Sequence, residues 1–146
     1  MNTIISRAVF LDFDGVLFDT VREVYAVSMI ALDRSARTTD INFGSKHFEK
    51  FNRLRYLVGS AWNYYYIIQA IDKESLDSTS DIENEYKNLL NQRMQEEHSS
   101  FEKFFFQVRN QLREKENDHW LSTVSPYSIV EDLRKIISAF QDQFFL

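Results

Sequence analysis

Two carboxylates separated by one residue, Asp12 and Asp14, are the side chains of this chain whose type and spacing could do chemistry. Carboxylates this close repel one another, so the pair needs a cation between them or a shared proton. A hard ion such as Mg²⁺ suits oxygen ligands together with a substrate phosphate. The two acids can then divide the work of phosphoryl transfer: Asp12 attacks phosphorus, and a protonated Asp14 supplies a proton to the leaving oxygen and later activates water.

The residues around this pair predict how it is positioned. A continuous apolar run, Ala8 to Leu11, precedes Asp12 and predicts a strand over Ile4 to Phe13 that is buried on both faces. Open α/β sheets bind ligands at the carboxyl ends of such strands. Gly15 then allows a tight turn at which the backbone carbonyl of Asp14 can also face a metal ion.

A calcium-binding loop is the main alternative for two closely spaced acids. If an EF-hand loop began at Asp12, Glu23 would stand at its twelfth position. Val16 and Leu17 would then occupy the fifth and sixth positions, where a ligand and a glycine are required. The sequence therefore excludes this alternative.

The segment VFLDFDGVLFDT, Val9 to Thr20, resembles motif I of the haloacid-dehalogenase superfamily. The resemblance implies a Rossmann-like core, Mg²⁺ dependence, Asp12 as nucleophile and Asp14 as general acid/base. It also implies that Mg²⁺ binds the Asp12 side chain and the Asp14 backbone carbonyl, with Gly15 beside the substrate. The second acid favours phosphate over halide, so the expected substrate is a small phosphorylated metabolite. Asp19 and Thr20 belong to the motif and are expected to stabilise the loop and the next helix start.

The remainder of the chain predicts helices. Only three Gly and one Pro occur, which leaves little of the turn punctuation that an all-β chain needs. Residues 21–124 are expected to form a helical insertion that resembles a C1-type cap, between a first core strand with its catalytic loop at 1–20 and a return segment at 125–146. The expected fold is mostly α with one core β-strand, as a fragment of an α/β Rossmann-like fold.

Several helix boundaries follow from local patterns. Capping boxes are expected at Thr20 with Glu23 and at Ser80 with Glu83, and a further helix is expected to begin at Ser99. Gly59 is expected to separate an apolar stripe of Phe48, Phe51, Leu54 and Val58 from one of Trp62, Tyr65, Tyr66 and Gln69. Pro126 is expected in the first turn of a last helix whose inward face comprises Ile129, Val130, Leu133, Ile136 and Ile137.

Two weaker candidates lie in the expected insertion. Arg55 and Gly59, in the segment RYLVG, resemble a cap segment that can face the phosphate site in C1-type relatives, and Arg55 could pair with a phosphate or carboxylate. The alternative is an exposed helical Arg followed by a helix-ending Gly. His47, His98 and His119 share no metal-ligand spacing and are expected at the surface. The many aromatic residues are expected to pack between helices, with a substrate pocket as the alternative.

Composition excludes several classes of protein. A formal charge of −5 argues against a protein that mainly neutralises nucleic-acid phosphates. No 18-residue apolar run or secretory leader is visible, so neither a membrane span nor export is expected, and a cytoplasmic location is the default. Zero cysteines exclude disulfides and thiolate zinc sites.

Parts of the family's catalytic machinery cannot be placed in this sequence. The family needs a Ser or Thr after the second core strand, a charge-neutralising Lys and further metal-binding acids. That strand would begin at about Gln143. We therefore expect the N-terminal part of an enzyme, inactive by itself. Its first strand is expected to pair with another chain, for instance in a strand-swapped homodimer, or to lie against the helical part. The competing hypothesis is a non-catalytic helical module for interaction or oligomerisation.

Overall fold

The structure is a computed structural model that describes residues 12, 14–73, 75–92 and 95–139. The predicted strand over Ile4 to Phe13 and the expected second core strand lie outside these residues, apart from Asp12. Within the described residues the chain is mostly helical, with seven α-helices and one two-stranded sheet, which confirms the helical prediction. The chain divides into two compact units, residues 21–123 and residues 1–20 with 124–146. Each unit is described by itself.

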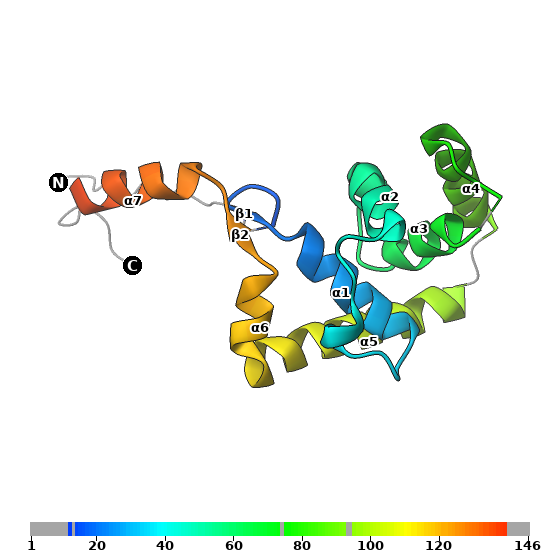
Figure 1. The fold of residues 1–146 in the computed structure, drawn as a ribbon, viewed down its shortest axis with the longest axis horizontal. Helices are drawn as coiled ribbons and strands as arrows, with labels where there is room; N and C mark the ends of the chain where they lie inside the picture. Colours follow the sequence, from blue (N-terminus) through cyan, green and yellow to red (C-terminus); the bar gives the residue numbers. More distant parts are fainter. Residues whose placement is uncertain (1–11, 13, 74, 93–94, 140–146) are drawn as a thin grey trace, which may run out of the picture. The chain divides into compact units, whose positions relative to one another are not determined.

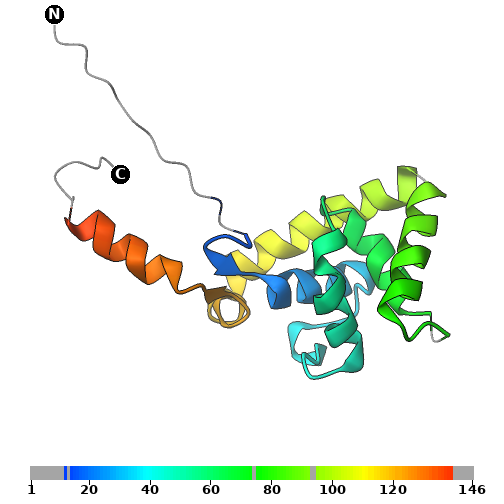
Figure 2. The same cartoon turned by 90° about the horizontal axis from the view of Figure 1, so that it is seen from above.

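Most helices belong to the unit of residues 21–123, hereafter the helical unit. Its elements are α1 (Val21–Leu32), η1 (Thr38–Asp40), α2 (Lys46–Leu54), η2 (Arg55–Leu57), α3 (Asn63–Ile71), α4 (Thr79–Asn91), α5 (Gln95–Lys115) and α6 (Asn117–Ser122). The long helix α5 lies along α1, and α3 packs against both α2 and α4 (Figures 1 and 2). None of the described helices is long and apolar enough to cross a bilayer.

Aromatic rings hold the centre of the helical unit together. The ring of Tyr64 on α3 stacks between Phe51 of α2, at 5.8 Å, and Phe105 of α5, at 5.6 Å. Tyr25 of α1 contacts Phe51 at 5.0 Å, so four helices meet in this cluster. Each such pair contributes about 0.5–1.5 kcal/mol beyond the apolar area that it buries. The expected aromatic packing between helices is therefore present.

The helix α3 is buried more completely than one apolar stripe predicts. Trp62, Tyr65 and Gln69, expected on its inward stripe, are only partly buried, whereas Tyr64, Ile67 and Ile68 have exposed fractions of 4% or less. Because α3 contacts α1, α2, α4 and α5, most of its surface faces other helices. Three members of the first predicted stripe, Phe48, Phe51 and Leu54, are buried on α2, whereas Val58 lies after η2 and is only partly buried. Gly59 does lie between α2 and α3.

Two predicted helix starts are wrong. The N-cap of α4 is Ser78, not Ser80: the Ser78 hydroxyl accepts from the Asp81 amide at 3.1 Å and donates to the Asp81 carboxylate at 2.6 Å. The same Ser-x-x-acid spacing occurs at both positions, and the earlier one begins the helix. In the second case, α5 begins at Gln95 and runs through Ser99, because Ser in a helix interior carries only a small penalty.

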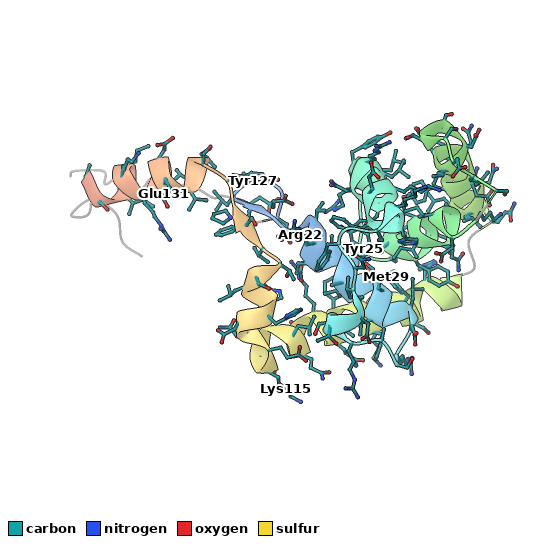
Figure 3. The ribbon with its side chains drawn as sticks, in the orientation of Figure 1. Arg22, Tyr25, Met29, Lys115, Tyr127 and Glu131 are labelled. Carbon is teal, nitrogen blue, oxygen red and sulfur yellow. The ribbon has the colours of Figure 1, made fainter. Side chains whose placement is uncertain are left out.

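The second unit contains β1 (Phe18–Asp19), β2 (Ser125–Pro126) and α7 (Ile129–Ala139). The strands are antiparallel, with Phe18 opposite Pro126 and Asp19 opposite Ser125. The Tyr127 amide extends the pairing by donating to the Leu17 carbonyl at 2.9 Å. The prediction that Pro126 lies in the first turn of the last helix is therefore wrong: Pro126 lies in β2, and α7 begins only at Ile129. The strand partner, Phe18, is far away in the sequence, so local patterns do not reveal the pairing. Tyr127 follows β2, and Glu131 lies in the first turn of α7 (Figure 3).

The expected inward face of α7 is not buried in the described part of the chain. Ile129, Ile136 and Ile137 have exposed fractions of 48%, 50% and 38%, and Val130 and Leu133 are only partly buried. The apolar spacing correctly predicts an amphipathic helix. Burial of its apolar face, however, requires a partner surface, which no described element supplies.

Candidate functional site

The two candidate acids lie on a turn that leads directly into β1. Asp12 is exposed, whereas Asp14 is partly buried and forms an isolated parallel bridge with Phe18. Gly15 closes the turn with a φ of 76°, and its amide donates to the Phe18 carbonyl at 2.9 Å. A side chain at position 15 would meet no atom within 4 Å, so the backbone conformation alone favours glycine. The structure thus brings Asp12, Asp14 and Gly15 together in one loop.

The strands β1 and β2 form a neck at the two ends of the helical unit. Because Asp19 lies opposite Ser125, the chain leaves at residue 20 and returns at residue 124 next to the same two-stranded ladder. Asp19 is exposed in β1, and Thr20, the last residue before α1, is 3% exposed. The 103 residues between form the helical unit, which both precedes and follows a strand of this ladder in the sequence.

The loop carries oxygen atoms of the kind that hard metal ions bind. The Asp12 carboxylate and the carbonyl and carboxylate of Asp14 are hard oxygen donors of the kind that Mg²⁺ prefers. No group of three or more His, Asp or Glu side chains that could hold a metal ion occurs among the described residues. The donors therefore match the chemistry of Mg²⁺ but are too few for an octahedral shell, whose other positions would need water, substrate phosphate and further acids.

Arg55 and Gly59 lie in and just after η2, in the helical unit. The Arg55 guanidinium is 5.1 Å from the centre of the Tyr64 ring, and its Nη1 donates to the Val58 carbonyl at 3.4 Å. Arg55 is partly buried, so the alternative of a fully exposed helical arginine is wrong. Gly59 is exposed, and an added Cβ would make only an ordinary contact with Asn63 at 3.8 Å. Nothing in the backbone or its surroundings requires glycine there.

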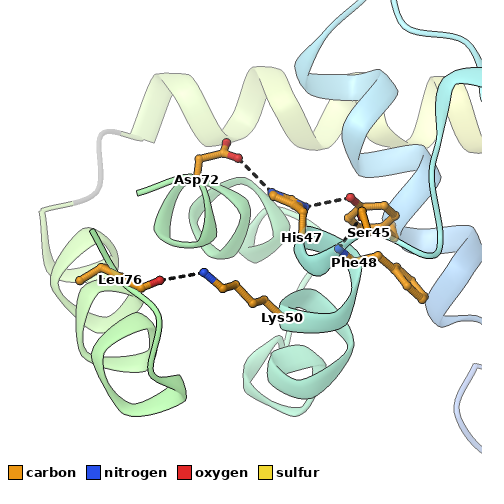
Figure 4. A network of polar contacts seen from close by, with 7 residues as sticks. Ser45, His47, Phe48, Lys50, Asp72 and Leu76 are labelled. Atoms are coloured by element: carbon orange, nitrogen blue, oxygen red, sulfur yellow. Dashed lines mark hydrogen bonds and ion pairs between the residues drawn. The ribbon is translucent and has the colours of Figure 1, made fainter. Parts of the chain in front are cut away.

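A polar network that sequence reasoning missed links three elements of the helical unit (Figure 4). His47 bonds through Nε2 to Asp72 at 2.9 Å and through Nδ1 to the Tyr25 hydroxyl at 2.8 Å. Burial is the main cause that raises the pKa of Tyr25; a hydrogen bond with Ser45 lowers it and the negative charge of Asp72 raises it further. Beside this network, Lys50 donates to the Leu76 carbonyl at 2.8 Å. Partners 22 and 25 residues apart leave no local signal in the sequence.

The three histidines, expected at the surface, are partly buried rather than fully exposed. The His98 ring lies 4.8 Å from the Trp62 ring, and Nε2 of His119 is buried with no hydrogen-bond partner in the described part of the chain. Aromatic packing, rather than metal binding, accounts for the position of His98. Tyr25, which bonds to His47, and Met29, which packs against the hydrophobic core, lie one turn apart on α1 (Figure 3).

Comparison of the chain with protein-family models, with curated proteins and with solved structures finds no match. The functional argument therefore depends on the Asp12–Gly15 loop and the neck beside it.

Proposed function

We propose that this chain is the N-terminal part of a Mg²⁺-dependent phosphatase of the haloacid-dehalogenase type, acting on small phosphorylated metabolites. The observation that carries the proposal is the coincidence of a DxDG loop, a left-handed Gly15 and a two-stranded neck that holds a helical insertion. An insertion directly after the catalytic loop is the arrangement that the resemblance to C1-capped enzymes implies.

The two acids would act in sequence. A carboxylate oxygen of Asp12 forms a bond to phosphorus while the bond to the leaving alkoxide breaks, and Asp14 donates its proton to that oxygen. Asp14, now ionised, then removes a proton from water, which attacks phosphorus and releases phosphate and free Asp12. The exposure of Asp12 leaves its carboxylate accessible to a substrate. Mg²⁺, held by Asp12 and the Asp14 carbonyl, would stabilise negative charge on the phosphoryl oxygens.

The apolar face of α7 supports the proposal that more of a core belongs beside this unit. Phosphoryl transfer gains most of its rate from positioning and charge stabilisation, and among the described residues no group of three or more acids or histidines that could hold a metal ion occurs. We therefore expect negligible turnover from this chain alone.

Trapping of the aspartyl-phosphate tests the proposal. Beryllium fluoride and Mg²⁺ added to a chain extended through the following reading frame should give a protein-bound ¹⁹F NMR signal. Asp12→Asn should abolish the signal, whereas Asp19→Asn, with the same charge change in the adjacent strand, should retain it. A signal that survives Asp12→Asn, or no signal with any phosphate analogue, would contradict the proposal.

An interaction module is the second candidate, because the exposed apolar residues of α7 could also bind a partner chain. In that case the chain should be a dimer or larger in light scattering, and Ile136→Glu should return it to a monomer. A stop codon directly after Leu146 would add support for this candidate. A reading frame that continues with an apolar strand ending in Ser or Thr would favour the enzyme.

A further inference from the structure

A groove with a mixed lining lies in the helical unit, between the loop after α1 and the helix α5. Its volume is about 480 Å³. Ile30, Phe104, Val108 and Leu112 supply apolar lining, and Arg34 and Arg37 supply two positive charges. Val108 and Leu112 are each 7% exposed, so this part of the lining belongs to the packed core. A ligand here would meet apolar surface and cationic side chains together.

The two arginines are available to an anion. The guanidinium of Arg34 lies 4.5 Å from the centre of the Phe104 ring, which orients it beside the apolar lining. Within the described residues neither Arg34 nor Arg37 forms an ion pair, in contrast to Arg53 and Arg109, which pair with Glu49 and Glu23. Both arginine residues are exposed. An oxyanion can therefore reach them without displacing an internal carboxylate.

Short hydrogen bonds hold the loop that carries these arginines. The Asp33 carboxylate accepts from the amide and the hydroxyl of Ser35, at 2.9 and 2.7 Å. The Arg37 amide donates to the Asp40 carboxylate at 2.9 Å, and the Thr38 hydroxyl donates to Glu116 of the α5–α6 junction at 3.2 Å. A loop fixed in this way loses less conformational freedom on binding than a mobile one.

We propose that this groove binds a small amphipathic oxyanion, with its apolar body against Phe104 and Leu112 and its carboxylate or phosphate group at Arg34 and Arg37. Guanidinium groups bind both kinds of oxyanion, often through two parallel hydrogen bonds. The proposal goes beyond phosphatase activity, because every residue that lines the groove belongs to the helical unit and none is a candidate catalytic acid. Glu116, the one acid in the lining, opposes the anion and limits its affinity.

Titration of the whole chain with four probes tests the proposal, with NMR or calorimetry as readout. Phenyl phosphate and phenylacetate each combine an apolar ring with an oxyanion. Inorganic phosphate has the oxyanion alone, and benzyl alcohol has the apolar ring alone. We expect at least one of the first two to bind saturably, about tenfold more tightly than either single-feature probe. The ratio between phenyl phosphate and phenylacetate then identifies the head group that the groove prefers.

Variants locate the binding site. Joint substitution Arg34→Gln and Arg37→Gln should weaken binding about tenfold or more, while Arg113→Gln, an exposed residue of α5 outside the groove, should change it less than about twofold. Glu116→Gln should tighten binding, which keeps the test decisive if the double variant folds poorly. Asp12→Asn should leave binding unchanged. The proposal is overturned by absence of saturable binding, by an equal loss in Arg113→Gln, or by dependence on Asp12.

Discussion

At the scale of single residues, the buried carboxylate of Glu23 connects three helices of the helical unit. It is 1% exposed, and its Oε1 accepts from Arg109 Nε at 2.8 Å and from Trp120 Nε1 at 3.3 Å. These contacts join α1 to α5 and α6. A carboxylate removed from water in this way is tolerated only because charged and polar donors surround it.

Removal of the Glu23 carboxylate should therefore destabilise the helical unit. We expect Glu23→Ala to lower the free energy of unfolding by about 3 kcal/mol, because Arg109 is left partly buried without its counter-charge. Urea denaturation followed by circular dichroism measures the change. Glu49→Ala, which breaks an exposed pair with Arg53, serves as the control and should cost less than about 1 kcal/mol. Equal losses in the two variants would contradict this account.

Two tyrosines should make the fold sensitive to alkaline pH. Burial raises the pKa of both Tyr25 and Tyr86. As pH rises past about 10, tyrosines of the unfolded chain ionise while these two keep their protons in the fold, so the free energy of unfolding falls. Their contribution is fully present below that pH. Urea melts between about pH 8 and 11 should show the loss, with Tyr86→Phe reducing its slope, and an unchanged slope in that variant would contradict this account.

At the scale of elements, local capping determines where α4 begins. Ser78 has extended backbone angles and its hydroxyl accepts from the Asp81 amide, whereas Ser80 already lies inside the first turn. Both serines precede an acid by three residues, so spacing alone does not distinguish them. The extended backbone of Ser78 is what makes it, and not Ser80, the N-cap of α4.

Paired substitutions measure this difference. We expect Ser78→Ala to lower the free energy of unfolding by about 1 kcal/mol, since the Asp81 amide loses its acceptor. Ser80→Ala should change it by less than about 0.5 kcal/mol. Thermal and urea unfolding of the two variants under one set of conditions supply the comparison, and a larger effect at Ser80 would place the cap where the sequence alone suggested.

At the scale of the whole molecule, the main hydrophobic cluster of the described residues lies within the helical unit. Every residue of the main buried cluster falls between Val24 and Leu112, and the cluster draws on α1, α2, α3, α4 and α5. The other unit contributes a two-stranded ladder and a helix whose apolar face is exposed. Stability should therefore reside almost wholly in residues 21–123.

An excised fragment of residues 21–123 should consequently fold by itself. We expect a cooperative urea transition with a free energy of unfolding within about 2 kcal/mol of that of the whole chain. Circular dichroism and amide-proton dispersion are the measurements. A fragment with helical circular dichroism but no dispersion would resemble a molten globule and would show that the neck helps to fix the packing.

Some properties of this protein follow from its sequence alone. The helical character, the amphipathic α7, the buried stripe of α2 and the turn at Gly15 depend on the order of neighbouring residues, and local patterns predict them. The candidate acids Asp12 and Asp14 are also read from spacing, and their catalytic role stays a prediction.

Only the tertiary structure decided the features that depend on partners distant in the sequence. The pairing of Pro126 with Phe18, the burial of Ile67 and Ile68, and the contact of His47 with Asp72 each require segments that the fold brings together. In α7, the periodicity of the sequence defines an apolar face, but this face is exposed in the described part of the chain. Burial of such a face depends on which other element packs against it. Side-chain chemistry and spacing determine which segments form helices, turns and apolar faces. The arrangement of these segments in space determines which faces are buried and which side chains contact one another.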